Sequence, residues 1–259
     1  MIQGRFYHPM LEISNLTKIY DGKVLALDKV TFEVQKGEFL AVIGLSGSGK
    51  STLLRCINRL VEPTSGQIIW NGVDITSANQ NEMRNVRRKI GMVFQHFNLV
   101  SRSKVITNVL SGRLGYINPA LSLLNRFPQA DIDLALKQLE RVGISDQAYK
   151  RADELSGGQQ QRVGVARAMM QEPDMILADE PVASLDPVLA HSIMQYLEKL
   201  NKEDGVTILC SLHFLDLVHE YADRAIALNQ GKLMFDGIPK EIDDDRFRNI
   251  YGQEAKRVG

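Results

Sequence analysis

The sequence has no excess charge of either sign and no long apolar run. Its 259 residues include 31 Lys and Arg against 31 Asp and Glu, so the formal net charge is zero. A chain that acts mainly on nucleic acid usually carries a basic excess, so we expect no nucleic acid partner. Apolar runs such as residues 39–43 are far shorter than the ~18–20 residues needed to cross a bilayer. Any membrane role is therefore expected to come through a partner.

Cysteine is also scarce, since Cys56 and Cys210 are the only two in the chain. Each lies in an apolar stretch, which predicts reduced, buried thiols rather than a disulfide. No apolar segment follows Arg5 within residues 1–10, so this segment is not typical of a secretory signal peptide.

Short apolar segments alternate with longer amphipathic ones, which predicts a layered α/β domain. The predicted strands are residues 11–17, 30–34, 39–43, 66–70, 90–94, 175–178, 206–210 and 224–228, with turns at 21–22, 71–72 and 229–231. The predicted helices are residues 49–58, 131–142 and 188–201. Between residues 97 and 155 the strand pattern fades, which indicates a mostly helical insertion.

Residues 44–51 read GLSGSGKS and match the phosphate-binding pattern G-x-x-x-x-G-K-[ST] between a predicted strand and a predicted helix. Glycines let several backbone N–H groups converge on one anion, and the helix N-terminus adds about half a positive charge. Lys50 is expected to reach the β- and γ-phosphates of a nucleotide, and the Ser51 hydroxyl to bind Mg²⁺. The predicted ATP–Mg²⁺ site comprises Gly44, Ser46, Gly47, Ser48, Gly49, Lys50, Ser51 and Thr52.

Two acids follow the apolar predicted strand at residues 175–178. Ligands of parallel α/β sheets bind at the carboxyl ends of the strands. We therefore expect Asp179 to bind Mg²⁺ through its water shell and Glu180 to polarise the attacking water.

A second glycine pair opens another predicted helix, where residues 155–159 read LSGGQ. Ser156 is expected to cap this helix, which creates a second anion site. One nucleotide does not need two such sites on the same chain. We therefore predict that the second site, formed by Ser156, Gly157, Gly158 and Gln159, contacts a nucleotide held by another copy.

Together, these three motifs resemble those of the ABC family of ATPases, and the resemblance extends over about residues 11–237. It implies an α/β fold with a P-loop NTPase core, an antiparallel β subdomain and an inserted α-helical subdomain. The implied boundaries are an N-terminal extension at 1–10, a RecA-like core at about 11–96 and 159–237, a helical subdomain at about 97–158 and a helical tail at 238–259.

The resemblance also implies roles for four further residues. Tyr20 would stack on adenine, and Gln95 would sense Mg²⁺ and touch a membrane subunit. Asp186, in the sequence Ser184-Leu185-Asp186, would contact the opposite protomer, and His213 would contact the γ-phosphate. The remaining histidines are expected to be surface or packing residues; they are His8, His96, His191 and His219.

The same resemblance implies an assembly at the cytoplasmic face of the cell (inner) membrane. Two copies of the chain would close head to tail over two ATP–Mg²⁺, beside two integral membrane permease subunits. A periplasmic or extracellular solute-binding protein would deliver the cargo.

Three segments resemble the phosphonate-import branch of the family: residues 111–115 with 124–127, the sequence PVASLDP at 181–187, and the tail residues Asp245, Arg246, Phe247, Ile250 and Tyr251. Phosphite importers share this branch, and the sequence leaves the cargo open between phosphonate, phosphite and another small solute. Residues 121–127 are expected to pack on the membrane subunit.

Three other functions are known to use ATPases of this kind. ABC ATPases of DNA repair carry long coiled-coil insertions and those of translation carry two ATPase units, and neither feature is present. An ABC-like subunit of a soluble phosphonate-degrading complex stays open, as does an exporter subunit. A membrane-spanning pair that co-purifies with the chain would favour import, whereas soluble lyase subunits would favour the degrading complex.

Overall fold

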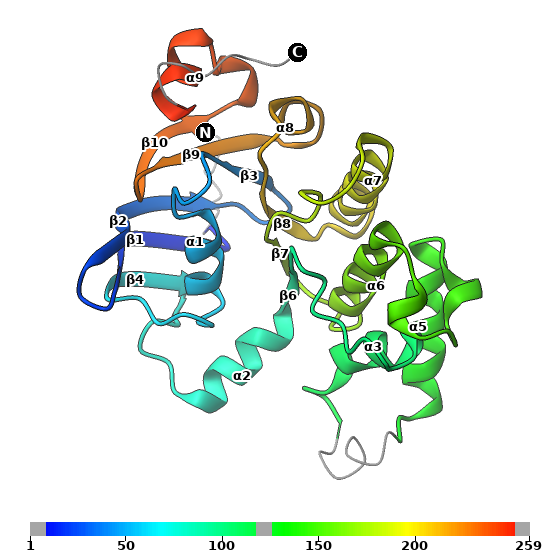
Figure 1. Ribbon diagram of the computed structural model, residues 1–259. Helices are drawn as coiled ribbons and strands as arrows, with labels where there is room; N and C mark the ends of the chain where they lie inside the picture. The colour runs from blue at the N-terminus through cyan, green and yellow to red at the C-terminus, as the bar shows by residue number, and fades with distance from the viewer. Residues whose placement is uncertain (1–8, 118–125, 252–259) are drawn as a thin grey trace, which may run out of the picture.

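The computed structural model describes residues 9–117 and 126–251 (Figure 1). The predicted N-terminal extension at 1–10 and the segment 121–127 lie mostly outside the described residues. Within those residues, no helix combines the length and the apolar character that a membrane span requires. Cys56 and Cys210 are buried free thiols, as predicted.

Ten strands within the described residues form two sheets (Figure 1). The smaller sheet is antiparallel where its strands pair, has the order β2-β1-β4-β5, and consists of β1 (Leu11–Tyr20), β2 (Val24–Val34), β4 (Ser65–Trp70) and β5 (Val73–Asp74). The larger sheet has the order β10-β9-β3-β8-β7-β6 and consists of β3 (Phe39–Ile43), β6 (Ile90–Val93), β7 (Met175–Ala178), β8 (Thr207–Ser211), β9 (Arg224–Asn229) and β10 (Lys232–Gly237). In the larger sheet only β10 runs antiparallel to its neighbour.

Strand β3 is buried on both faces, which explains its uninterrupted apolar sequence FLAVI. Because side chains alternate along a strand, its residues divide between two cores. Phe39, Ala41 and Ile43 pack into the core beneath the helices of the middle region. Leu40 and Val42 pack into the core shared with β1, β2 and the first helix. The larger sheet is therefore fixed between two layers.

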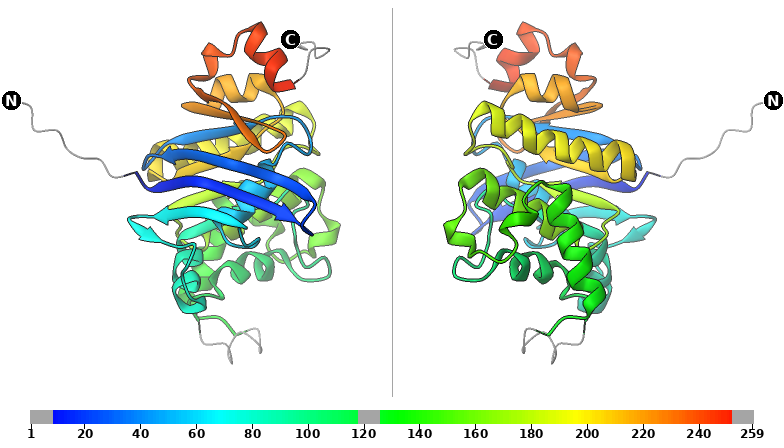
Figure 2. Two further views of the ribbon diagram at one scale, coloured as in Figure 1. Left: turned by 90° about the vertical axis from the view of Figure 1, so that its left-hand side faces the viewer. Right: turned by 90° about the vertical axis from the view of Figure 1, so that its right-hand side faces the viewer.

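Eight α-helices are described: α1 (Lys50–Ile57), α2 (Gln80–Lys89), α3 (Val105–Leu110), α5 (Gln129–Arg141), α6 (Gly157–Met169), α7 (Pro187–Asp204), α8 (Leu215–Tyr221) and α9 (Asp244–Tyr251). Four short 3-10 helices complete the described helical segments: η1 (Ser111–Arg113), η2 (Ser145–Gln147), η3 (Ala152–Glu154) and η4 (Pro239–Glu241). Helices α3, α5 and α6 pack together to one side of the sheets (Figures 1 and 2). One core cluster joins these helices to β3 and β6–β9. The division into a core and a helical subdomain stays a prediction.

Candidate functional site

The loop between β3 and α1 has a conformation that requires glycine. Gly44, Gly47 and Gly49 all have positive φ angles, of 141°, 78° and 110°. A Cβ atom on Gly44 would lie 2.2 Å from the carbonyl oxygen of Leu228, and one on Gly49 would lie 2.5 Å from that of Ala26. The loop therefore tolerates no side chain at these two points, and its backbone amides stay available to an anion.

Lys50 is buried at the start of α1 and points back across this loop. Its Nζ donates to the carbonyl oxygens of Gly44 at 2.8 Å and Leu45 at 3.0 Å, and lies 3.7 Å from Oε1 of Glu180. Burial lowers the pKa of the Lys50 ammonium, and the Glu180 carboxylate opposes that shift. A buried cation is thus held at the centre of the loop.

Next along α1, Ser51 joins the loop to the end of β7. Its hydroxyl donates to Oδ1 of Asp179 at 2.6 Å, although the two residues are 128 positions apart. Asp179 is 1% exposed, and Arg55 lies 3.2 Å from its other oxygen. A hydroxyl and a carboxylate oxygen side by side are hard ligands of the kind that Mg²⁺ prefers.

The surroundings of Ser51 and Asp179 fit a nucleotide-bound Mg²⁺ rather than an ion held by protein alone. Among residues 9–117 and 126–251, no group of three or more His, Cys, Asp or Glu could hold a metal ion. Mg²⁺ usually keeps several waters and binds through one or two carboxylates together with substrate phosphates. In the same loop, the buried Ser48 hydroxyl has no hydrogen-bond partner within the described residues. A phosphate oxygen would satisfy it.

Glu180 and His213 come from neighbouring strand ends and meet directly. Nε2 of His213 lies 2.6 Å from Oε1 of Glu180, and this nitrogen must donate because a carboxylate only accepts. Glu180 has a φ of 49°, unusual for a residue other than glycine, and its backbone amide donates to the Ser211 hydroxyl at 2.8 Å. The Glu180 carboxylate is therefore held between the Lys50 ammonium and the His213 imidazole.

Two further residues at the site, Ser211 and Arg55, are not predicted from the sequence. The buried Ser211 hydroxyl contacts the backbone of Glu180 and lies 3.4 Å from Oδ1 of Asp179, so it fixes both acids. The available signal was a serine at the polar end of an otherwise apolar strand, β8. Arg55 carried no such signal, because an arginine on an exposed helix face is ordinary.

Two further predicted residues lie beside this cluster. The Tyr20 hydroxyl, at the end of β1, is 3.5 Å from the Thr52 hydroxyl, so the tyrosine lies next to α1. Gln95 is half-buried and follows β6, at the edge of the sheet where β3, β7 and β8 also end. Ser46 lies exposed in the loop itself.

The second predicted anion site is formed at α6 but lies apart from the cluster. Ser156 caps α6 through a capping box: its hydroxyl accepts from the Gln159 amide at 3.4 Å, and its own amide donates to Oε1 of Gln159 at 3.0 Å. The predicted cap is thus confirmed, and Ser156 and Gly157 are exposed, whereas Gly158 is buried against Leu189. Among the described residues, no hydrogen bond or ion pair links this cap to the Lys50 loop.

Asp186 and the remaining histidines have local partners or are exposed. Asp186 caps α7, where its Oδ1 accepts from the Leu189 amide at 3.1 Å. His191 contacts the Tyr221 hydroxyl at 3.1 Å, and His96 and His219 are exposed. His8 lies outside the described residues.

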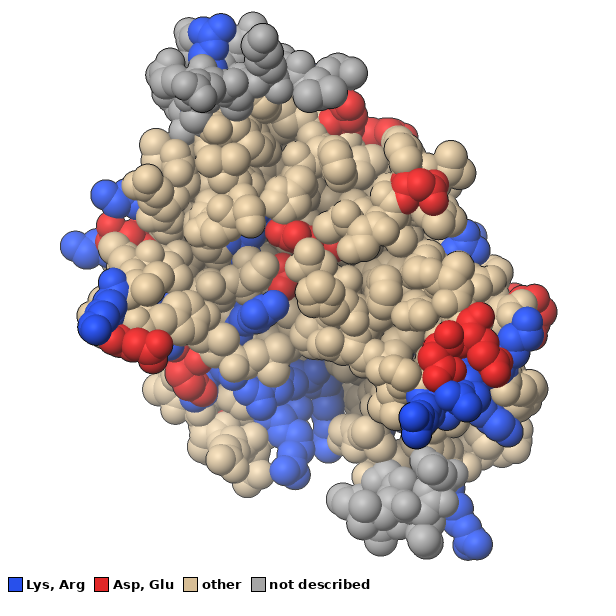
Figure 3. All heavy atoms as spheres, in the orientation of Figure 1, with Lys and Arg blue, Asp and Glu red and all other residues tan. Residues whose placement is uncertain are grey.

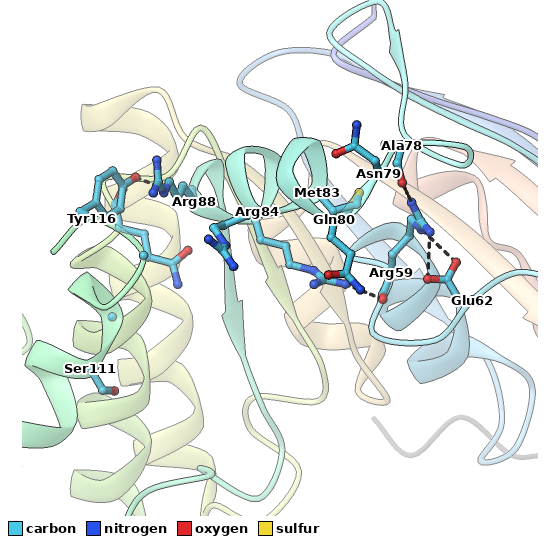
Figure 4. Close-up of a pocket in the computed structure, with 14 residues that line it drawn as sticks. Arg59, Glu62, Ala78, Asn79, Gln80, Met83, Arg84, Arg88, Ser111 and Tyr116 are labelled. Carbon is cyan, nitrogen blue, oxygen red and sulfur yellow. Dashed lines mark hydrogen bonds and ion pairs between the residues drawn. The ribbon is translucent and has the colours of Figure 1, made fainter. Parts of the chain in front are cut away.

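A separate cavity of about 760 Å³ lies between α2 and the segment that follows α3. Figure 3 shows basic side chains gathered in this hollow, and Figure 4 shows Arg84 and Arg88 of α2 facing it. The cavity is lined by four arginines, Arg59, Arg84, Arg87 and Arg88, and by a single acid, Glu62. Glu62 forms an ion pair with Arg59. Three guanidinium groups, those of Arg84, Arg87 and Arg88, have no carboxylate partner among the described residues. The cavity is therefore strongly basic in a chain of zero net charge.

The fold and the P-loop cluster, formed by the Gly44–Gly49 loop with Lys50, Ser51, Asp179, Glu180 and His213, define an ATPase of the transporter type. The chain belongs to the ABC transporter family, whose model matches residues 27–183. It is an ATP-binding, ATP-hydrolysing member with the ABC ATPase fold, so the predicted family and fold class are confirmed.

Several relatives match the chain over nearly its whole length. "Phosphonates import ATP-binding protein PhnC 1" of Halalkalibacterium halodurans is 53% identical over 95% of this chain and 96% of the relative. The PhnC protein of Bdellovibrio bacteriovorus is 52% identical over 96% of each chain. That of Shouchella clausii is 51% identical over 96% of this chain and 95% of the relative.

Solved structures of similar fold include ATP-binding cassettes in different states. A dimeric, post-hydrolysis structure of the cassette MJ0796 bound to ADP and Pi is 34% identical with a TM-score of 0.80, and the match covers 89% of this chain and 99% of that one. A nucleotide-free cassette from an ABC transporter is 31% identical with a TM-score of 0.79, and the match covers 94% and 95% of the two chains.

Proposed function

We propose that this chain is the ATP-hydrolysing subunit of an importer for phosphonates, peripheral to the cytoplasmic face of the membrane. The observation that carries the proposal is the 53% identity, over 95% of the chain, to a protein named for phosphonate import. At such identity over such length, the surfaces that meet partner subunits are expected to be shared as well as the ATP site.

The P-loop cluster supplies the positions that hydrolysis of ATP requires. Phosphoryl transfer to water depends mainly on positioning and on neutralising charge. The amides of the Gly44–Gly49 loop and the Lys50 ammonium bind the phosphates, and Tyr20 stacks on the adenine. Ser51 and Asp179 would hold Mg²⁺, with Gln95 nearby, and the ion would neutralise phosphate charge.

Glu180 is the residue that orients the attacking water. Its carboxylate lies between the Lys50 ammonium at 3.7 Å and the His213 imidazole at 2.6 Å. His213 fixes the carboxylate and reaches towards the γ-phosphate. Ser211 holds the backbone of Glu180 in its positive-φ conformation, so the carboxylate is fixed before substrate arrives.

The exposed cap of α6 serves a second copy of the chain. Ser156 and Gly157 are exposed at the N-terminus of α6, and within the described residues no hydrogen bond or ion pair links them to the Lys50 loop of their own chain. In a head-to-tail dimer, each cap closes over the γ-phosphate held by the other chain, and Asp186 lies at the same seam. ATP favours the closed pair because its phosphates bridge both chains, whereas ADP does not.

The import function is tested by reconstituting the chain with its membrane-spanning subunits and its binding protein in proteoliposomes. ATP hydrolysis is expected to rise when the binding protein carries a phosphonate. Stimulation by phosphite alone would assign the cargo to phosphite instead. Co-purification with soluble lyase subunits, and with no membrane subunit, would contradict import.

The arginine-lined cavity is proposed as the face that meets an acidic segment of the membrane subunit. Arg84 is exposed and makes no hydrogen bond or ion pair among the described residues, so its charge is available to a partner. We expect Arg84→Glu to weaken association with the membrane subunits by at least about tenfold, because like charges brought together across an interface cost several kcal/mol.

The control for Arg84→Glu is Lys36→Glu, which makes the same charge change at an exposed turn between β2 and β3. Both variants should bind ATP normally, as measured by calorimetry on the purified chain. If pull-down of the membrane subunits is equally strong for the two variants, the cavity is not the docking face.

A further inference from the structure

One face of α1 holds both oxygens of the Asp179 carboxylate. Ser51 and Arg55 are four residues apart, about one helical turn, so their side chains leave the helix on the same side. The Ser51 hydroxyl donates to Oδ1 of Asp179 at 2.6 Å, and Nη2 of Arg55 donates to Oδ2 at 3.2 Å. A single helix therefore holds the carboxylate at two points, one on each oxygen.

The two oxygens of Asp179 have unequal surroundings. Oδ1 also lies 3.4 Å from the Ser211 hydroxyl, so it has two hydroxyl neighbours. Within residues 9–117 and 126–251, Arg55 is the one side chain that donates a hydrogen bond to Oδ2. The Asp179 side chain is 1% exposed, so water has little access to replace that donor. Because the torsion that turns a carboxylate is broad, contacts on both oxygens are needed to fix its plane.

Arg55 lies away from the phosphate-binding loop. Four residues along an α-helix correspond to about 6 Å, so the backbone of Arg55 is that much further along α1 than the backbone of Ser51. The Arg55 side chain is 47% exposed, whereas the Lys50 side chain, which crosses the loop, is 3% exposed. In the part of the chain that the structure describes, no hydrogen bond joins the Arg55 guanidinium to the Gly44–Gly49 loop. Its effect on a bound nucleotide must therefore pass through Asp179.

We propose that Arg55 is a positioning residue for the nucleotide-bound Mg²⁺. By holding Oδ2 of Asp179, the guanidinium turns Oδ1 towards the Ser51 hydroxyl, and these are the two oxygens that would face the ion. Partners that orient a metal ligand from its outer side typically contribute about 10–100-fold to metal affinity. The proposal rests on the proposed ATP–Mg²⁺ site.

A positioning role and a simple charge role predict opposite results for Arg55→Met. If Arg55 only neutralised Asp179, its loss would leave a more negative site, and Mg²⁺ would bind more tightly. If Arg55 positions the carboxylate, the Mg²⁺ concentration for half-maximal ATP hydrolysis should rise about tenfold or more. The gain in ATP affinity that Mg²⁺ gives should shrink as well. ATP affinity in EDTA should stay unchanged, because the guanidinium does not touch the nucleotide.

The experiment is a Mg²⁺ titration of ATP hydrolysis by the full-length chain, together with calorimetry of ATP binding in Mg²⁺ and in EDTA. Arg55→Lys is the conservative variant: it keeps a donor for Oδ2 but not the guanidinium geometry, so its half-maximal Mg²⁺ concentration should lie between those of the wild type and Arg55→Met. This variant also tests the proposal if Arg55→Met does not fold. The control is Arg102→Met at an exposed arginine in the segment before α3, which should change none of these values.

A half-maximal Mg²⁺ concentration that is unchanged or lower in the Arg55 variants, with a normal response in the wild type, would overturn the proposal alone. A wild-type chain that binds ATP equally well in Mg²⁺ and in EDTA and hydrolyses it without Mg²⁺ would overturn both this proposal and the assignment of the Mg²⁺ site.

Discussion

Glu180→Gln is expected to leave ATP binding intact and to lower the rate of hydrolysis by about 10²–10⁴-fold, the range for loss of a general base. The amide keeps the size of the side chain and can still pair with His213, but it cannot polarise the attacking water. Because ATP then stays bound between two chains, the variant should elute as a stable dimer in size-exclusion chromatography with ATP and Mg²⁺. Without nucleotide it should not gain this stability.

The control for Glu180→Gln is Glu140→Gln, which removes one carboxylate from an exposed position on α5. This variant should hydrolyse ATP at the wild-type rate and show no trapped dimer. Normal turnover by a monomeric Glu180→Gln chain would show that another residue orients the water.

Lys50→Ala is expected to weaken ATP binding at least about 100-fold. The side chain provides charge-assisted hydrogen bonds to phosphate, each worth about 1.5–3 kcal/mol, and every 1.4 kcal/mol is a factor of ten. Its loss also leaves the Glu180 carboxylate without the cation 3.7 Å away, so a negative charge would face the phosphates. Calorimetric titration with ATP measures the effect directly.

Because Lys50 is buried, Lys50→Met is the companion variant. Methionine retains most of the aliphatic stem and should keep the melting temperature near that of the wild type. Loss of ATP binding in a folded Lys50→Met chain would attribute the effect to the charge. Undiminished ATP affinity in both variants would contradict the assignment of the P-loop.

The sequence predicts the central strands well, because those strands are buried on both faces. Residues 39–43 and 175–178 are predicted with the same bounds as β3 and β7, since each is a short apolar run between turn residues. Strands with an exposed face are predicted too short: β2 begins at Val24, six residues before the predicted strand, where its side chains are exposed.

Helix α2 was not predicted, and the reason is physical. It buries only Met83 among ten residues, so it has no apolar periodicity. Its one local signal is the capping box formed by Asn79 and Glu82. The arginine-lined cavity beside α2 could therefore not be predicted from the sequence, because a run of arginines is ordinary on an exposed helix.

The residues of the candidate site that lie in a local motif are predicted from the sequence. The contacts that depend on the fold are not. The P-loop and the pair Asp179 and Glu180 follow from local patterns, and the rule that ligands bind at strand ends brings them together. The Ser211 contacts with Glu180 and Asp179 depend on packing between distant elements. No local pattern records these contacts.

In the proposed dimer, each ATP is bound by both chains. The most direct measurement is a structure of the Glu180→Gln chain with ATP and Mg²⁺. It should place the Ser156 hydroxyl and the amides of Gly157 and Gly158 of one chain within about 3.2 Å of γ-phosphate oxygens that Lys50 of its partner also binds. A closed pair in which every α6 cap faces solvent, with each nucleotide bound by one chain alone, would contradict this shared binding of ATP.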